Sequence, residues 1–211
     1  MPQGNIGNMK GETICDVTGL ILAGGLARRM DGQDKGLILF RGEAMAQRIA
    51  RALRPQCHRI LINANRNISE YEKFGCPVIL DQLADFQGPL AGMLTGLNNI
   101  STSWMVTAPC DGPFMAIDYV KKMKQAVTLN NHALAVASCN DRLQPVYAMI
   151  HQSLIESLEA FLASDERKID KWYGQHDYTI VDFSNSPQMF ENINTPEQLR
   201  ALERLNQPAG D

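Results

Sequence analysis

The chain has 211 residues, of which 45% are hydrophobic and 20% charged, and its formal net charge at pH 7 is −3. A chain of this length buries roughly 70% of its unfolded surface on folding, so it needs neither disulfides nor a structural metal for stability. The slightly acidic balance, without a basic block, excludes duplex nucleic acid and anionic membranes as expected partners. A polyanionic substrate must therefore be bound by local cations.

The cysteines and histidines form no recognisable metal or disulfide pattern. The five cysteines are scattered without a CxxC pair, and the four histidines share no helical spacing. The first residues lack the charged-then-apolar pattern of a signal peptide, and no apolar run approaches the ~20 residues of a membrane span. We therefore expect a soluble, cytoplasmic, monomeric protein.

In chain order, the pattern begins with a polar segment, residues 1–16, which we expect to be a flexible tail before a single domain over residues 17–211. The apolar run 17–23 then stops abruptly at Gly24-Gly25, which is typical of a strand buried on both faces. Further strands are predicted at 59–64, 78–80, 104–108, 133–138, 145–150 and 178–183. Helices are predicted at 43–54, 69–74, 88–99, 117–127, 154–162 and from Thr195 onward.

Two of these helices carry more specific expectations. In the fourth, the apolar residues Ile117, Val120, Met123 and Val127 share one face, and Lys121, Lys122 and Lys124 are expected to face solvent. In the last, residues 195–198 have the spacing of a capping box. The alternation of strands and helices predicts an α/β fold, a three-layer, doubly wound, mostly parallel sheet. In such sheets ligands bind beyond the carboxyl ends of the strands.

A glycine-rich basic loop, LAGGLARRMDGQDKG (residues 22–36), follows the first predicted strand. Adjacent glycines permit positive φ and bring backbone N–H groups close to an anion. Arg28, Arg29 and Lys35 add the cations that a triphosphate requires. Because the loop matches neither GxxxxGK[ST] nor GxGxxG, a Walker-type loop is excluded and a dinucleotide-binding fingerprint is disfavoured. The loop thus predicts a polyphosphate-binding site, and the alternative is a solvated basic turn.

The loop resembles the first loop of nucleotidyltransferases, L-A-G/A-G-x-S/A-x-R-M-G-x-x-K. Its Gly24-Gly25 pair and its Asp34-Lys35-Gly36 ending are similar to those of the molybdenum cofactor guanylyltransferases. The same resemblance extends over 62–66 (INANR), Asp81, 88–92 (GPLAG), 109–111 (PCD) and 192–197 (NINTPE). Asp31 departs from the pattern, since it stands where the family usually has glycine.

This resemblance implies a Rossmann-like nucleotidyltransferase fold and an Mg²⁺-dependent enzyme that transfers GMP from GTP to the terminal phosphate of molybdopterin. It also implies partners that deliver or receive the cofactor: other molybdenum cofactor biosynthesis proteins, and recipient molybdoenzymes or their chaperones. No segment of the sequence identifies those partners. The resemblance places Leu22, Ala23, Gly24 and Gly25 around the nucleotide.

Three acidic and amide residues follow predicted strands. Asp111 could hold Mg²⁺ or cap a helix, and the resemblance implies the metal role, with phosphate oxygens and water completing the shell. Asn63 and Asp81 could form turns, and the resemblance implies that they bind GTP, where a carboxylate can accept from the guanine N–H and amino groups.

The remaining roles concern the transfer itself. We expect Lys35, Arg29 and Asp111 to be catalytic, because an ionised phosphate nucleophile needs positioning and charge compensation rather than a general base. The resemblance suggests that Asn192 and Asn194 bind the pterin, although local turn chemistry is an alternative. Three other functions stay open: a cytidylyltransferase on a related phosphorylated acceptor, a non-catalytic GTP-binding or carrier protein, and an oxidoreductase.

Overall fold

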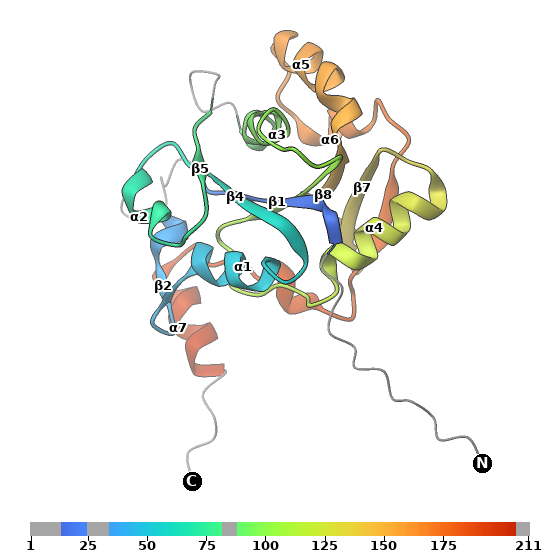
Figure 1. Ribbon diagram of the computed structural model, residues 1–211. Coiled ribbons are helices and arrows are strands. Elements are labelled where there is room, and N and C mark those ends of the chain that lie inside the picture. The colour runs from blue at the N-terminus through green and yellow to red at the C-terminus, as the bar shows by residue number, and fades with distance from the viewer. Residues whose placement is uncertain (1–13, 25–33, 82–87, 206–211) are drawn as a thin grey trace, which may run out of the picture.

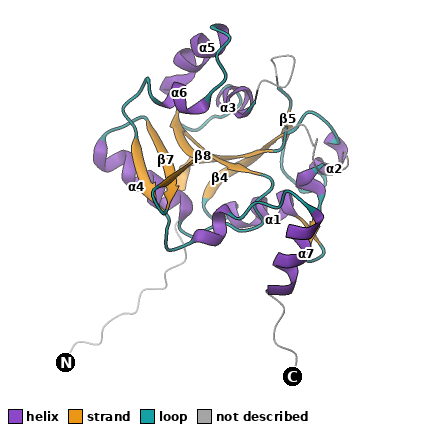
Figure 2. Cartoon of the chain, turned by 180° about the vertical axis from the view of Figure 1, so that it is seen from behind, coloured by secondary structure: helices purple, strands orange, loops and turns teal. Residues whose placement is uncertain are grey.

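Strands and helices alternate along the chain and fold into three layers. The computed structural model describes residues 14–24, 34–81 and 88–205. The strands of the main sheet are β1 Ile14–Leu22, β4 Cys57–Asn63, β5 Val78–Ile79, β6 Trp104–Pro109, β7 Leu134–Cys139, β8 Arg142–His151 and β9 Thr179–Asp182. The α-helices are α1 Met45–Leu53, α2 Ile68–Glu72, α3 Pro89–Leu97, α4 Tyr119–Asn130, α5 Ile155–Ala163, α6 Ile169–Tyr173 and α7 Pro196–Leu205. Helices α3, α5 and α6 cover one face of the sheet, and α1 and α4 cover the other (Figures 1 and 2).

The sheet is mostly parallel, as the sequence predicts. Its strand order is β5-β4-β1-β6-β8-β7-β9, and only β8 runs antiparallel to its neighbours. The reversal follows from a tight hairpin between β7 and β8, in which Asn140 and Asp141 adopt φ values of 48° and 61°. Short polar side chains tolerate this left-handed conformation, which suits a two-residue hairpin turn.

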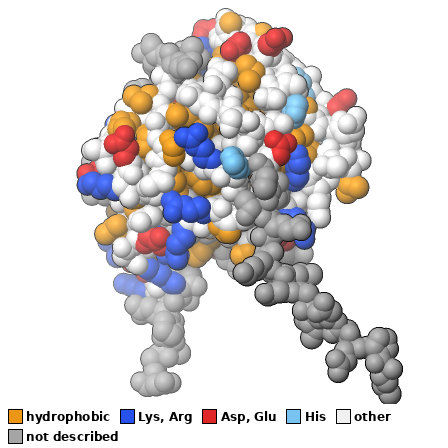
Figure 3. All heavy atoms as spheres, viewed as in Figure 1, with side chains coloured by type: hydrophobic (Ala, Val, Ile, Leu, Met, Phe, Trp, Pro, Cys, Tyr) orange, Lys and Arg blue, Asp and Glu red, His pale blue; other side chains and the backbone are white. Residues whose placement is uncertain are grey.

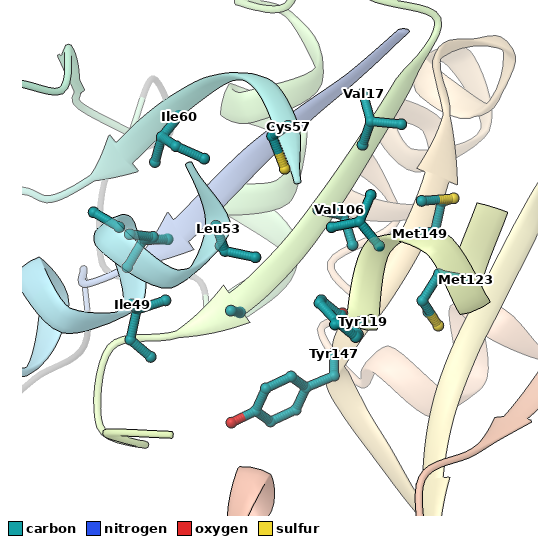
Figure 4. Packing of buried hydrophobic residues seen from close by; sticks show 14 of the residues in the cluster. Val17, Ile49, Leu53, Cys57, Ile60, Val106, Tyr119, Met123, Tyr147 and Met149 are labelled. Carbon is teal, nitrogen blue, oxygen red and sulfur yellow. The ribbon is translucent and has the colours of Figure 1, made fainter. Parts of the chain in front are cut away.

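Successive residues of the central strands point to opposite faces, which gives the protein two hydrophobic cores. Ile21 and Val106 pack with α1 and α4, whereas Leu20 and Met105 pack with α3 and α5. Figure 4 shows the first of these cores, in which Leu53 of α1 and Met123 of α4 lie near residues of the sheet. This two-sided burial explains why β1 and β6 read as continuous apolar runs rather than as alternating strands.

Strand β1 lies in the middle of the parallel part of the sheet. The chain leaves β1 for β4 on one side and returns to β6 on the other. Leu22, the last residue of β1, pairs with Asn63 of β4 and with Pro109 of β6, so the three strands end level with one another. Such a switch point is where open α/β sheets bind ligands, and Gly24 at the start of the predicted loop lies there together with the predicted Asn63 and Asp111.

Some elements differ from the sequence prediction. β1 begins at Ile14, so residues 14–16 belong to the sheet rather than to the expected tail. A small hairpin of β2 Leu39–Phe40 and β3 Glu43–Ala44 precedes α1, and neither these strands nor α6 was predicted. Two-residue strands are too short for a detectable periodicity.

The predicted buried face of α4 is also partly wrong. The helix begins at Tyr119, so Ile117 precedes it and is 92% exposed. Lys124 is expected to face solvent, but its Nζ lies 4.4 Å from the centroid of the Trp104 ring and 4.0 Å from Asp16 Oδ2. The ammonium group thus makes a cation–π contact with the indole. Among the described residues, no helix is long and apolar enough to span a bilayer.

Candidate active site

The carboxyl edge of the sheet brings together polar side chains that are far apart in the sequence. Lys35 begins a short 3-10 helix, Lys35–Leu37, and Asp111 lies in the turn that follows the end of β6 at Pro109. The Lys35 Nζ donates to Asp111 Oδ2 at 3.2 Å and also to Asn194 Oδ1. The Lys35 side chain is 25% exposed and that of Asp111 17% exposed, so the pair is partly shielded from water.

The segment 192–194 lies beside Asp111 because its central residue is anchored there. The Ile193 N–H donates to the Asp111 carbonyl at 2.8 Å, and the Ile193 side chain is fully buried against Phe40 and Met45. The backbone N–H of Asn194 donates to Gln198 Oε1 at 2.7 Å, and the Gln198 N–H donates to Thr195 Oγ1 at 3.2 Å. One of the two bonds of the predicted capping box is therefore present, and the Gln198 side chain bonds the residue before the cap instead of the cap itself.

Asp111 has one oxygen that is not used by the described part of the protein. Oδ2 accepts from Lys35, whereas Oδ1 is buried and has no hydrogen-bond partner within residues 14–24, 34–81 and 88–205. A buried carboxylate oxygen without a donor is costly unless a ligand or cation meets it. The helix-cap alternative for Asp111 is not borne out, because the N-cap residue of α4 is Asp118.

Cys110 lies between β6 and Asp111 and is a buried structural residue. Its side chain is buried, and burial, together with the nearby Asp111 carboxylate, raises the pKa of the thiol far above its ordinary value. The thiol therefore stays protonated at neutral pH and is a poor nucleophile.

A second cluster surrounds the carboxylate of Asp81, just beyond β5. Asn63 Nδ2 donates to Asp81 Oδ1 at 2.8 Å, and Asn65 Nδ2 donates to Asp81 Oδ2 at 2.7 Å. The Asp81 N–H donates back to Asn65 Oδ1 at 2.8 Å. The hydroxyl of Thr95 in α3 lies 3.5 Å from Asp81 Oδ1. The carboxylate is thus held in a fixed orientation by amide donors from β4 and the loop after it.

Glycines allow the backbone to approach this second cluster closely. A Cβ on Gly24 would lie 3.0 Å from Asn65 Nδ2 and 3.3 Å from Asn63 Oδ1. A Cβ on Gly92 of α3 would lie 2.4 Å from Asn63 Oδ1 and 2.7 Å from Leu22 Cδ2. The sequence prediction grouped Gly24 with Asn63 and Asp81, and the structure brings them together. The sequence prediction did not include Asn65 and Thr95 in the site, because their role in holding the Asp81 carboxylate is evident only from their contacts with it.

The other predicted residues divide into two groups. Leu22 and Ala23 lie at the end of β1, where the Ala23 N–H donates to the Asn63 carbonyl at 2.8 Å, and Asn192 lies exposed beside Gly112, whose Cβ would come 3.4 Å from Asn192 Oδ1. Gly25, Arg28, Arg29 and Asp31 lie outside the described residues, so their roles stay predictions.

The protein carries little net charge. On the face shown in Figure 3, basic and acidic side chains are interspersed, in keeping with the small net charge of −3. A polyphosphate would therefore be held at this edge by specific contacts, with little long-range attraction.

The chain matches known proteins over most of its length. Residues 19–179 match the model of the MobA-like NTP transferase domain. The chain is 44% identical over 186 residues to the molybdenum cofactor guanylyltransferase of Shewanella sp. (strain MR-4), covering 88% of this chain and 94% of the relative. It is 45% identical over 186 residues to that of Shewanella pealeana, covering 88% of this chain and 93% of the relative.

Solved structures share the fold at low sequence identity. The molybdopterin-guanine dinucleotide biosynthesis protein A of Archaeoglobus fulgidus superposes with a TM-score of 0.72 at 19% identity, over 89% of this chain and 97% of that chain. The 4-diphosphocytidyl-2C-methyl-D-erythritol synthase of Anaerococcus prevotii superposes with a TM-score of 0.68 at 12% identity, over 91% of this chain and 96% of that chain. The fold is therefore shared by proteins named for guanine and for cytosine nucleotides, and it does not by itself select the base.

Proposed function

The chain belongs to the MobA-like NTP transferase family, and from this premise we propose that it transfers GMP from GTP to the terminal phosphate of molybdopterin. The products are pyrophosphate and the molybdopterin guanine dinucleotide. The observation that carries the proposal is the convergence of Lys35 and Asp111 at the carboxyl ends of β1 and β6. A cation next to a carboxylate with a buried oxygen that has no partner among the described residues suits a metal-bound triphosphate.

The reaction is an in-line displacement at the α-phosphorus of GTP. An oxygen of the acceptor phosphate forms the new P–O bond, the bond between the α-phosphorus and the bridging oxygen breaks, and pyrophosphate leaves with the electron pair. Because the attacking phosphate is already ionised, no side chain has to remove a proton. Lys35 stabilises the charge on the transferring and leaving phosphates, and this requires that its ammonium move from Asp111 to the nucleotide or bridge the two.

Asp111 is the residue proposed to hold Mg²⁺. Its buried Oδ1 lacks a partner among the described residues, which fits a cation ligand. No group of three or more histidine, cysteine, aspartate or glutamate side chains in the described ranges could hold a metal by itself. Phosphate oxygens and water would complete the shell, and a bound Mg²⁺ would offset charge on the phosphates.

The cluster around Asp81 is proposed to bind the guanosine. Its carboxylate is an acceptor that suits the ring N–H and the amino group of guanine, which cytosine does not present in that arrangement. Asn63, buried to 2% exposure, holds this carboxylate and borders Leu22 of β1. Asn194, which Lys35 contacts, and Asn192, which lies beside Gly112, are proposed to bind the acceptor.

Nucleotide competition and product analysis test the proposal. GTP should displace a fluorescent GTP analogue at a concentration at least about 100-fold lower than CTP, because a site built to pair polar groups rejects a ligand that leaves them unpaired. Pyrophosphate should be released from GTP only when Mg²⁺ and molybdopterin are both present. Equal competition by CTP would point to a cytidylyltransferase, and GTP binding without pyrophosphate release would point to a carrier.

Replacing Gly92 with alanine is expected to raise the KM for GTP by about 10- to 100-fold. Alanine normally stabilises a helix interior by about 1 kcal/mol relative to glycine, but here the new methyl group would displace Asn63 from Asp81. Steady-state kinetics measure the effect.

The matched control is Gly96→Ala in the same helix. The nearest atoms to its methyl group would be those of the Leu20 and Met105 side chains in the core, so it should lower the melting temperature and leave the KM near the wild-type value. A Gly92→Ala protein with the wild-type KM would argue against nucleotide binding at the Asp81 cluster.

A further inference from the structure

Asp34, the residue before Lys35, is a buried carboxylate that the proposed reaction does not use. It is 7% exposed, and the donors that surround it come from two separate parts of the chain. Its Oδ1 accepts from the Gly36 N–H at 3.3 Å, where it caps the 3-10 helix that begins at Lys35. The same oxygen accepts from the hydroxyl of Tyr71 in α2 at 2.5 Å. A buried carboxylate this well bonded is a fixed point in the structure.

The loop between β4 and α2 supplies the other donors. Asn67 Nδ2 donates to Asp34 Oδ2 at 3.1 Å, and Arg66 Nε lies 3.5 Å from the same oxygen. Asn67 stands at the N-cap position of α2, yet its side chain does not cap that helix, and its backbone has a φ of 51°. Asparagine tolerates this left-handed conformation, and the side-chain amide of Asn67 makes no capping bond to its own helix. Here the side chain is used to bind Asp34.

Tyr71 and Gly36 are shaped to fit each other at this carboxylate. Tyr71 is fully buried, and burial, above all other causes, raises the pKa of its hydroxyl far above the ordinary value, so that the group remains a donor. A Cβ on Gly36 would lie 2.4 Å from the Tyr71 hydroxyl oxygen. Only glycine at position 36 therefore lets the tyrosine reach Asp34.

We propose that Asp34 is a positioning residue: with Tyr71 and Asn67, it fixes the backbone of Lys35 so that the Lys35 ammonium lies at Asp111. Asp34 touches no reacting atom. Its network bonds the chain immediately before and after Lys35 to α2, and the lysine side chain then reaches Asp111 and Asn194 on the other side. The inference rests on the proposed function for its catalytic consequence, but the placement of Lys35 can be measured without any substrate.

Two kinds of variant separate positioning from simple stability. Tyr71→Phe removes one donor to Asp34, and Tyr173→Phe is its matched control, because Tyr173 is equally buried and donates to the Pro145 carbonyl at 2.7 Å in the opposite core. Asp34→Asn turns a side-chain amide toward the donors of Asn67 and Arg66. The exchange Asp34→Asn/Asn67→Asp restores one donor and one acceptor at that contact and returns a carboxylate to the neighbourhood of Arg66.

The first readout is the rate at which Lys35 is acetylated in the ligand-free full-length protein, followed by mass spectrometry below the melting temperature. Tyr71→Phe and Asp34→Asn should label Lys35 several-fold faster than the wild type, and the exchange and Tyr173→Phe should label it at the wild-type rate. The second readout is GMP transfer, in which the same two variants should lose about 10- to 100-fold in kcat, with recovery in the exchange.

Unchanged labelling and unchanged kcat in Tyr71→Phe and Asp34→Asn would overturn the inference. It would also be overturned if the double variant Asp34→Asn/Asn67→Asp recovered neither the wild-type labelling rate nor the wild-type kcat. A wild-type protein that labels as expected but transfers no GMP would overturn the proposed function and leave the placement of Lys35 standing.

Discussion

Asp111→Asn is expected to lower the rate of GMP transfer by about 10²–10³-fold. The asparagine keeps the size of the side chain but removes the charge and turns an amide donor toward the phosphates or toward the buried position of Oδ1. A cation ligand is lost in either case. The Mg²⁺ concentration that gives half-maximal rate should rise as well, because the remaining ligands are phosphate oxygens and water.

Stability measurements distinguish this loss from misfolding. The Lys35–Asp111 ion pair is only partly buried, so the free energy of unfolding should change by about 1 kcal/mol or less. Asp118→Asn is the matched control, since Asp118 forms a comparable ion pair with Lys122 at 3.0 Å on α4, and it should retain wild-type activity. Full transfer activity in Asp111→Asn would rule out its role as the metal ligand.

Lys35→Met should also lower kcat by about 10²–10³-fold, for a different reason. Methionine keeps much of the apolar stem but supplies no charge to the transferring and leaving phosphates. The two variants should respond oppositely to metal. In the wild-type protein the Lys35 ammonium neutralises the Asp111 carboxylate. Lys35→Met should therefore strengthen the binding of Mn²⁺, used as a paramagnetic probe for Mg²⁺, whereas Asp111→Asn should weaken it.

Lys122→Met is the control for Lys35→Met and should retain the wild-type kcat. Electron paramagnetic resonance of free Mn²⁺ and single-turnover transfer measure the two effects separately. If Lys35→Met retained the wild-type rate of the chemical step, the lysine would be a structural partner of Asp111 and not a catalytic group.

Local sequence patterns predict much of the fold and the edge at which the site lies. Apolar runs that end at Gly24 or before Asp111 mark strands buried on both faces, because α-helices cover both sides of the sheet. Parallel strands then carry their terminal polar residues to one edge, and Asn63, Asp81 and Asp111 follow from this rule. The family resemblance adds the chemical identity of the substrates, which no periodicity contains.

Other features depend on contacts between distant segments and were not predictable from local sequence. The bond between Lys35 and Asn194 joins residues 159 positions apart. It exists because Ile193 is buried in a third small core beside Asp111, and a sequence pattern that suggested a pterin contact for Asn194 could not reveal this. The place of β8 between β6 and β7 likewise follows from a hairpin and from strand pairing, which local patterns do not encode.

The buried carboxylate of Asp34 shows the same limit. In the sequence it reads as one more charge in a basic loop, and its partners Asn67 and Tyr71 read as a turn residue and a core residue. Their common role follows only from the packing of α2 against the end of the loop.

The most direct test of guanylyl transfer follows labelled phosphate from GTP in the presence of Mg²⁺ and molybdopterin. With the label on the α-phosphate, radioactivity should appear in a pterin dinucleotide, in a ratio of one to one with released pyrophosphate. With the label on the γ-phosphate, it should appear only in pyrophosphate. Transfer of the γ-label to the pterin, labelling of the pterin from CTP in preference to GTP, or GTP that stays intact would contradict the account.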